Sequence, residues 1–172
     1  MRNILKLQKK GYEMLVPAEL YKYEIEKQMK LNSYTDEMLY YSGCVGGYNF
    51  ELNDDNYGEH KYAIIDSNDK LIGFFAYNID YYCRKAWNFG LYSFDKGKPV
   101  IGFDVFRQLN KLITEYKLHK ITWRMIGGNP VGKHYDKFCF KNLGAKHYLK
   151  DEIKDKYGNY HDDIIYEIIF EN

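Results

Sequence analysis

Apolar positions in the first third of the chain repeat at loosely helical spacing. We predict a helix over residues 17–29, because Pro17 suits the first turn of a helix and the apolar residues after it share one face. A second helix is predicted over residues 35–43, with Thr35 as its N-cap. Residues 46–59 are rich in Gly, Asn and Asp, which is typical of an exposed loop. The apolar face of the first helix comprises Leu20, Tyr23, Ile25 and Met29.

The pattern changes to strands after this loop. Residues 62–66 and 71–79 are rich in β-branched and aromatic residues, and the polar residues 67–70 between them predict a hairpin. A further strand is predicted over residues 86–94. Because no charged residue interrupts it, we expect both of its faces to be covered and the strand to be central in the sheet.

The strongest periodic signal is an amphipathic helix over residues 101–116. A short strand, residues 121–126, follows it. A strand, a helix and a strand in this order require a right-handed crossover and parallel pairing of residues 86–94 with residues 121–126.

A last helix and a hairpin complete the chain. The helix begins near Pro130 and ends at Gly144, a residue type that commonly stops helices. Residues 146–153 and 164–170 are predicted to form the arms of the hairpin, with turn-forming residues 157–159 between them. The buried side of the helix should comprise Val131, Tyr135, Phe138 and Leu143.

Length and composition indicate a single globular domain. With 172 residues, 45% of them hydrophobic and 28% charged, the chain can bury one core, so we expect one domain over residues 1–172. The three cysteines lie far apart and show no metal-ligand spacing, which favours free thiols in a reducing compartment and no metal site. Because neither a leader pattern nor a long apolar run is evident, we expect a cytoplasmic protein with no membrane partner.

The charge argues against a nucleic-acid partner. The chain has 25 Lys plus Arg and 24 Asp plus Glu, and a net charge of +1 would not hold it on a polyanion. Its 19 Tyr and 10 Phe could stack on single-stranded nucleic acid, but AT-rich codon usage explains their number better. An aromatic-rich interaction module is therefore the third hypothesis for function.

The order of elements, together with several local phrases, resembles the GNAT N-acetyltransferase superfamily over residues 62–170. The phrase YAIIDSNDKLIGFFAYNID is similar to the family's second and third strands, and DKYGNYHDDIIYEI is similar to its closing hairpin. The resemblance implies an α/β (α+β-like) fold with a mixed, mostly antiparallel central sheet flanked by helices. It also implies acetyl-CoA as cosubstrate and an amine as acceptor. Whether the chain forms a homodimer is left open.

The family's cofactor site lies where its central strand meets the next helix, and here this junction reads FDKGKPVIGF, residues 94–103. A helix N-terminus presents unsatisfied N–H donors and a partial positive charge, which suit a pyrophosphate. By the resemblance, a backbone N–H near the end of the central strand holds the thioester carbonyl. The implied cofactor-binding residues are Tyr92, Ser93, Phe94, Lys96, Gly97, Lys98, Val100, Ile101, Gly102 and Phe103, with Asn129 beside the pantetheine arm.

The junction departs from the family's glycine pattern. When Gly102 is taken as the last glycine, Val100 stands where the first glycine belongs and Gly97 stands where Arg or Gln belongs. Pro99 also removes one N–H donor. Taken alone, this loop is better explained as an ordinary strand-to-helix turn with solvated lysines, whereas the surrounding element order favours the cofactor site.

The phrase GGNPVGKHYDKFCFKNLGA resembles the family segment that carries an Asn, a helical Tyr beside the CoA sulfur and a terminal Leu-Gly pair. Counting forward from Asn129 places Tyr135 at the catalytic position, whereas counting back from Gly144 places Phe140 there. A phenol with its usual pKa of about 10 is protonated at neutral pH and can donate to a leaving thiolate. Tyr135 is therefore the candidate catalytic residue, and an ordinary core role for it stays open.

The sequence shows no convincing general base, because the central strand contains no Glu, Asp or His. Asp80 and the acidic residues within 51–59 are available, but acidic loops are usually just solvated, so the base is left unassigned. The leading hypothesis is an N-acetyltransferase that acts on an unidentified amine. Its rival is a GNAT-like protein that binds CoA or another partner without turnover.

Overall fold

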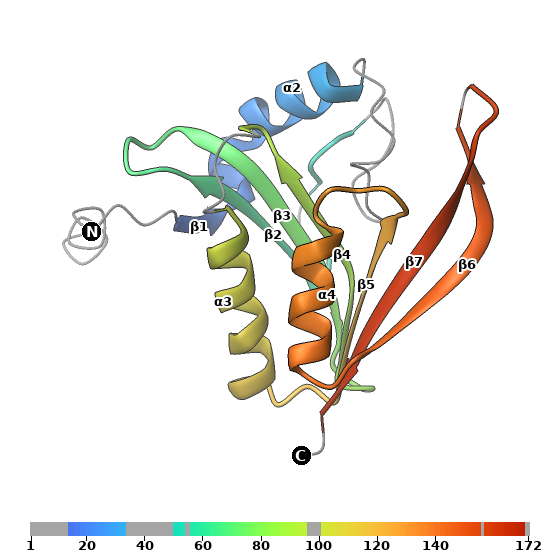
Figure 1. Cartoon of the computed structure of the whole chain (residues 1–172). Helices are drawn as coiled ribbons and strands as arrows, with labels where there is room; N and C mark the ends of the chain where they lie inside the picture. Colours follow the sequence, from blue (N-terminus) through green and yellow to red (C-terminus); the bar gives the residue numbers. More distant parts are fainter. Residues whose placement is uncertain (1–13, 34–49, 54–55, 96–100, 156, 171–172) are drawn as a thin grey trace.

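A computed structural model describes residues 14–33, 50–53, 56–95, 101–155 and 157–170. Its centre is one seven-stranded sheet with the strand order β1-β2-β3-β4-β5-β7-β6. Every neighbouring pair is antiparallel except β4 and β5, which are parallel. The predicted fold class, a mostly antiparallel mixed sheet flanked by helices, is confirmed (Figure 1).

The elements of the described residues are the strands β1 (Met14–Pro17), β2 (Glu59–Ile65), β3 (Leu71–Asp80), β4 (Lys85–Ser93), β5 (Lys120–Ile126), β6 (Ala145–Lys154) and β7 (Tyr160–Ile169), the 3-10 helix η2 (Ala18–Tyr21), and the helices α2 (Lys22–Ser33), α3 (Ile101–Thr114) and α4 (Gly132–Lys141).

The first predicted helix begins later than expected. Pro17 is the last residue of β1, opposite Tyr62, and not part of a first helical turn. An edge strand tolerates proline because one side of its backbone has no ladder partner. In the helical segment that follows, Ile25 and Met29 are buried as predicted, whereas Leu20 and Tyr23 are 70% and 73% exposed.

The structure tests the next two predictions, a helix and a loop, only in part. The helix predicted over residues 35–43 lies outside the described residues, as does part of the loop predicted over residues 46–59. The described part of that loop has no helix or strand before Glu59, where β2 begins, and Leu52 is buried at 2% exposure, so the loop is not wholly exposed.

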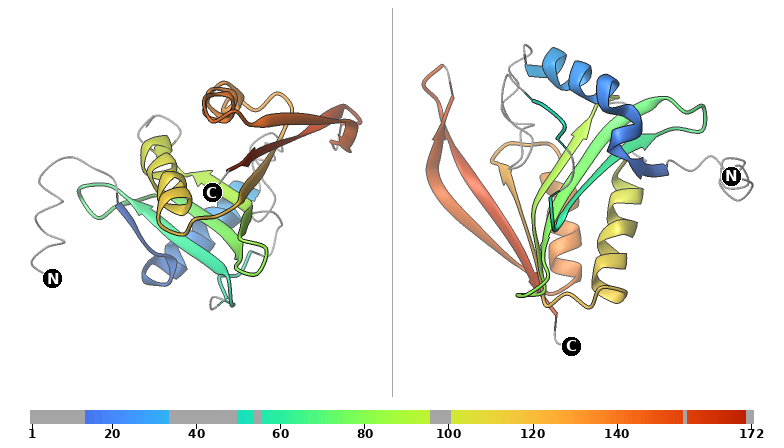
Figure 2. Two further views of the ribbon diagram at one scale, coloured as in Figure 1. Left: turned by 90° about the horizontal axis from the view of Figure 1, so that it is seen from below. Right: turned by 180° about the vertical axis from the view of Figure 1, so that it is seen from behind.

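Each face of the sheet has its own hydrophobic core (Figure 2). Helices α3 and α4 cover one face, where Phe75, Leu112 and Tyr166 are buried. Helix α2 covers the other face over the β2–β4 half, where Ile25 packs with Phe74. The predicted hairpin, the central position of β4, the long amphipathic helix and its parallel crossover are all confirmed.

The last helix ends earlier than predicted. Helix α4 stops at Lys141, and Leu143, expected on the buried side, is 96% exposed with a positive φ of 56°. The left-handed backbone at Leu143 turns its side chain outward, whereas Gly144 next to it packs closely: a Cβ there would lie 2.5 Å from the Glu167 carbonyl oxygen. The closing hairpin β6–β7 is confirmed and projects beyond the helices (Figure 1).

Candidate functional site

Strands β4 and β5 separate at the centre of the sheet. They pair only where Lys85 faces Lys120 and Ala86 faces Ile121, and beyond these positions the two strands diverge. The backbone groups of β4 that face β5 therefore have no ladder partner there. The resulting wedge opens toward the carboxyl ends of both strands (Figure 1).

A β-bulge lies in β4 where the wedge opens. Ala76 pairs with Gly90 and Asn78 pairs with Trp87, so two residues of β4, Asn88 and Phe89, oppose the single residue Tyr77. Asn88 has a φ of 56°, a left-handed conformation that asparagine adopts more readily than most residues. A bulge bends its strand and re-aims its side chains, and this one does so at the mouth of the wedge.

On the α3–α4 side, the wedge contains a small apolar cavity. Its volume is about 20 Å³, which accommodates one water-sized group. Two side chains in its wall bear a polar hydrogen, the Tyr135 hydroxyl and the Trp123 indole. The cavity is lined by Phe75, Phe89, Leu91, Val105, Leu109, Trp123, Tyr135 and Phe138.

Tyr135 projects from the first turn of α4 into this cavity wall. Its ring lies edge-on to Trp123 and Tyr166, with centroid distances of 6.0 and 5.9 Å. Burial raises the pKa of Tyr135 to about 12, so its hydroxyl keeps its proton at neutral pH. Phe140, the alternative from counting back along the helix, is 56% exposed and does not line the cavity.

The predicted residues at the end of β4 lie on the opposite side of the strand or form local contacts. Tyr92 is buried in the α2-side core beside Phe94, with ring centroids 5.8 Å apart. The Ser93 hydroxyl donates a hydrogen bond to the Asp95 carbonyl, 3.0 Å away. The Asn129 side chain accepts a hydrogen bond from the Val131 backbone N–H at 3.0 Å, which shapes the turn into α4.

The predicted phosphate loop is described only at its end. Lys96, Gly97, Lys98 and Val100 lie outside the described residues. Ile101, Gly102 and Phe103 form the first turn of α3, as the cofactor-site hypothesis requires.

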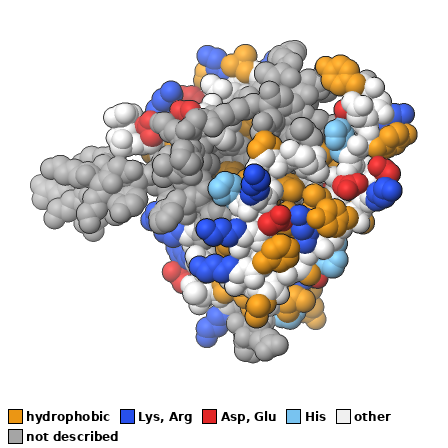
Figure 3. Space-filling view, viewed as in Figure 1, with side chains coloured by type: hydrophobic (Ala, Val, Ile, Leu, Met, Phe, Trp, Pro, Cys, Tyr) orange, Lys and Arg blue, Asp and Glu red, His pale blue; other side chains and the backbone are white. Residues whose placement is uncertain are grey.

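The α3–α4 face also carries basic side chains. In the space-filling view, Lys and Arg side chains are scattered among apolar ones on this face (Figure 3). They create a local positive potential that attracts anions. The exposed basic residues of the two helices are Arg107, Lys111, Lys133, Lys137 and Lys141.

A second, larger pocket lies on the α2 side of the sheet. Its volume is about 370 Å³, and it has a mixed polar and apolar wall. The Lys61 ammonium donates to the Glu59 carboxylate at 2.7 Å, and this hydrogen bond holds the pKa of Glu59 below its usual value. The pocket is lined by Phe50, Glu51, Leu52, Asn53, Asn56, Glu59, His60, Lys61, Phe74, Ala76, Tyr77, Asn78 and Asn88.

The two cavities lie on opposite sides of the bulge. Phe89 lines the small apolar cavity on one face of the sheet, and its neighbour Asn88 lines the larger pocket on the other face. Two ligands entering from opposite faces would therefore approach the sheet at neighbouring residues of β4. The sequence-based prediction places the thioester contact at residues 92–94, and the bulge lies earlier in the same strand, at Asn88 and Phe89.

Charged side chains of β5 and β7 form ion pairs next to the wedge. Asp163 is buried at 3% exposure and is paired with Arg124, whose side chain is 53% exposed. Counting from Ala86 opposite Ile121, and allowing for the extra bulge residue, Gly90 and Arg124 stand at the same level on the two sides of the wedge.

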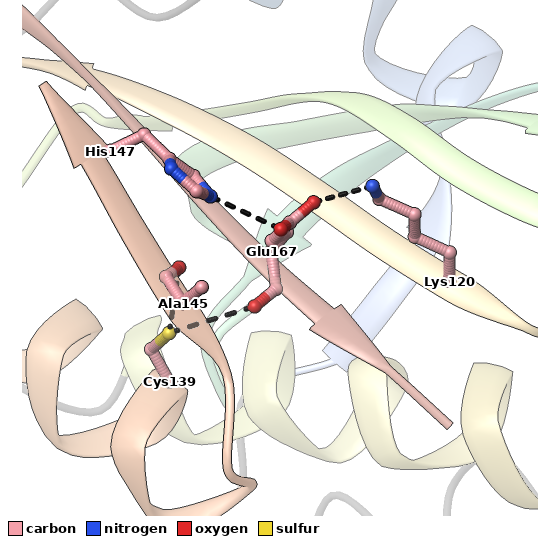
Figure 4. Close-up of polar contacts among 5 residues, drawn as sticks. All are labelled: Lys120, Cys139, Ala145, His147 and Glu167. Carbon is pink, nitrogen blue, oxygen red and sulfur yellow. Dashed lines mark hydrogen bonds and ion pairs between the residues drawn. The ribbon is translucent and has the colours of Figure 1, made fainter. Parts of the chain in front are cut away.

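Farther along β7, Glu167 accepts hydrogen bonds from Lys120 and His147, while its main-chain carbonyl faces Cys139 (Figure 4). Asp80, an alternative base, accepts backbone hydrogen bonds from Tyr82 and Cys83 in a turn. Among the described residues, no group of three or more His, Cys, Asp or Glu is arranged to hold a metal ion. No helix within the described ranges is both long and apolar enough to cross a membrane.

No protein-family model matches the chain, and no curated protein matches its sequence. Solved structures do resemble it. A Vibrio cholerae spermidine N-acetyltransferase in complex with CoA and spermine has a TM-score of 0.68 and 18% identity over 91% of this chain and 95% of that one. A spermidine/spermine N-acetyltransferase of the same organism, in complex with manganese ions, has a TM-score of 0.60 and 17% identity over 94% of each chain.

A third similar structure is a dodecameric spermidine N-acetyltransferase from Vibrio cholerae, with a TM-score of 0.54. Its identity to this chain is 25%, and the match spans 65% of each chain. Together these similarities show that the chain shares the fold of N-acetyltransferases.

Proposed function

Because the chain has the fold of the GNAT N-acetyltransferases, we propose that it is an acetyl-CoA-dependent N-acetyltransferase that acts on an amine. The observation that carries this proposal is the presence of two cavities on opposite faces of the sheet, one on each side of the β4 bulge. One is apolar and has room for a small uncharged group such as the end of an acyl chain, and the other has polar walls and suits an amine.

The donor would enter on the α3–α4 side. The N-terminus of α3 offers free N–H groups to the pyrophosphate, with Gly97 and Gly102 allowing close approach and Lys96 and Lys98 adding positive charge. Basic residues on the exposed faces of α3 and α4 add attraction for the phosphates. The acetyl end would then lie in the wedge beside Tyr135.

The chemistry follows from the groups around the wedge. The amine nitrogen attacks the thioester carbonyl carbon, and a backbone N–H of β4, in the part that diverges from β5, stabilises the charge that develops on the carbonyl oxygen. The C–S bond then breaks, and the Tyr135 hydroxyl gives its proton to the leaving thiolate. The products are an N-acetyl amide and the free thiol of CoA, with the amine's proton passing to a base.

Among the residues that the structure describes, Glu51 is the best candidate for the base that receives that proton. It lines the acceptor pocket and forms no ion pair with another described residue, whereas Glu59 is held by Lys61. A carboxylate in this pocket would also attract a cationic amine. Because a structurally similar enzyme was solved with CoA and spermine, polyamines are the first acceptors to test.

The test begins with binding. Calorimetry should detect acetyl-CoA, and saturating acetyl-CoA should raise the Tm. An amine panel, read by the thiol released, should then identify acceptors. Glu51→Gln should lower kcat roughly ten- to a thousandfold, while the control Glu152→Gln, exposed on β6, should not. Absence of any heat and any stabilisation at millimolar acetyl-CoA would reject the proposal.

The rival function, a GNAT-like protein that binds CoA without turnover, is favoured by one observation. The β4 strand carries no carboxylate or imidazole, so proton removal depends on a group from elsewhere. Binding of acetyl-CoA without thiol release across the amine panel would support this rival.

Self-association belongs to the same proposal. A dodecameric enzyme is among the similar structures, so we propose that this chain forms homo-oligomers. Sedimentation equilibrium of the purified protein tests this, and a mass of one chain at all concentrations would contradict it.

A further inference from the structure

The Trp123 indole N–H is a buried donor without an acceptor. Trp123 is 6% exposed, and its Nε1 has no hydrogen-bond partner among the described residues. Buried polar groups in folded proteins nearly always have a partner, so an unpaired one calls for a specific explanation.

The indole cannot turn away to find an acceptor. Its ring stacks on Tyr166 with centroids 5.1 Å apart and an interplanar angle of 6°, and Phe138 packs on it at 5.7 Å. Tyr166 is itself held, because its hydroxyl donates to Asp136 at 2.7 Å and Asp136 is paired with Lys146 at 2.8 Å. The orientation of the indole is therefore built into the core before any ligand arrives.

The cavity beside Trp123 restricts the chemistry of a ligand. Its wall is formed by aliphatic and aromatic side chains, among them Trp123 and Tyr135. Charged groups would be strongly disfavoured in such a wall. A small uncharged group with a hydrogen-bond acceptor fits, and a carbonyl oxygen meets that requirement.

We propose that the Trp123 indole N–H donates a hydrogen bond to a carbonyl oxygen of the acetyl-pantetheine arm. This inference rests on the proposed function and assigns a binding residue to it. In this proposal the two side chains have different roles. Tyr135 donates a proton to the leaving sulfur, and Trp123 donates a hydrogen bond to a carbonyl oxygen. That carbonyl belongs either to the thioester or to the nearest amide of the arm.

The experiment removes the N–H and keeps the ring. The chain contains two tryptophans, and Trp87 lines neither cavity, so Trp87→Phe leaves Trp123 as the sole tryptophan. In this background, biosynthetic replacement of Trp123 by 3-benzothienylalanine exchanges the N–H for sulfur at nearly constant volume. The matched control is the Trp87→Phe protein with natural tryptophan.

We expect the Kd for acetyl-CoA, measured by calorimetry, to rise about tenfold on this replacement. The Tm of the free protein should stay the same or rise, because the lost donor had no partner there. CoA, which lacks the thioester carbonyl, separates the two acceptors. A loss for acetyl-CoA alone identifies the thioester, and equal losses for acetyl-CoA and CoA identify an amide.

An unchanged Kd for both ligands would overturn the inference while leaving the proposed function intact. If the protein with 3-benzothienylalanine does not fold, the fluorescence of Trp123 in the Trp87→Phe protein provides the test. Binding of acetyl-CoA should shift its emission maximum, and binding without a shift would overturn the inference. If the control protein itself binds no acetyl-CoA, the proposed function fails, and this inference fails with it.

Discussion

The Asn88 side chain donates a hydrogen bond of 3.3 Å to the Asn78 side chain, across the bulge that lies between the two cavities. This contact pins a residue that already has a left-handed backbone, with φ at 56°. The backbone geometry of the proposed reaction centre therefore depends on the asparagine side chain at position 88.

The first prediction concerns that residue. Asn88→Val should destabilise the protein by about 1–2 kcal/mol, because a β-branched residue disfavours positive φ. It should also lower kcat/KM roughly a hundredfold, since the backbone of β4 beside the proposed reaction centre would move. Asn88→Gly keeps the backbone conformation and should cost less in both urea unfolding and kinetics. Equal behaviour of Val and Gly variants would contradict the role of the bulge.

The second prediction concerns Tyr135. Tyr135→Phe keeps the ring packed against Trp123 and deletes the hydroxyl, so kcat should fall roughly ten- to a thousandfold with acetyl-CoA affinity nearly unchanged. Tyr160→Phe, at an exposed position of β7, is the control. Adding Phe140→Tyr should not restore activity, because position 140 points away from the cavity wall. Rescue by that change would move the catalytic position to residue 140.

The third prediction concerns the pair of Arg124 and Asp163. Arg124→Gln leaves a buried carboxylate without its cation and should cost about 3 kcal/mol of unfolding free energy. Asp163→Asn leaves a half-exposed guanidinium that water can solvate, so it should cost only about 1 kcal/mol. Urea unfolding of both variants at pH 7 tests this asymmetry, and equal losses would show that burial of Asp163 does not set the energetics.

The fourth prediction concerns pH and Glu167. Hydrogen bonds from Lys120 and then from His147 lower the pKa of Glu167 from its usual value of 4.5. A carboxyl with a depressed pKa stabilises the fold above its unfolded pKa, and this contribution is lost as the pH falls through the folded pKa. Wild type should exceed Glu167→Gln by roughly 0.5–1 kcal/mol at pH 7, and the difference should vanish in acid.

Urea unfolding of both proteins at a series of pH values between 7 and 3 measures that difference. The control is Glu152→Gln, which removes an exposed carboxyl of β6. A wild-type advantage that stays constant across the series would show that the ion pairs of Glu167 contribute nothing to the pH dependence.

Local pattern was enough to predict much of the fold. The turn between β2 and β3, the apolar spacing of α3 and the uncharged run of β4 are signals contained within a few consecutive residues. Their order then dictated a parallel crossover, because a strand that returns through a helix must pair in parallel. Errors arose where a local signal has two outcomes: Pro17 suits a helix start or an edge strand, and Leu143 suits a helix face or an outward-turned cap.

The candidate site, by contrast, depends on contacts between distant residues. The register of β3 against β4 decides that the bulge falls at Asn88, and the divergence of β5 decides that the wedge opens there. Neither is visible in the sequence, because a one-residue shift in pairing leaves every local propensity unchanged. The sequence determined most of the elements and limited the candidates for the catalytic position to Tyr135 and Phe140. Only tertiary packing decided that Tyr135 lines the cavity and that Trp123 stands beside it with an unpaired donor, because burial depends on what the other strands and helices place around a side chain.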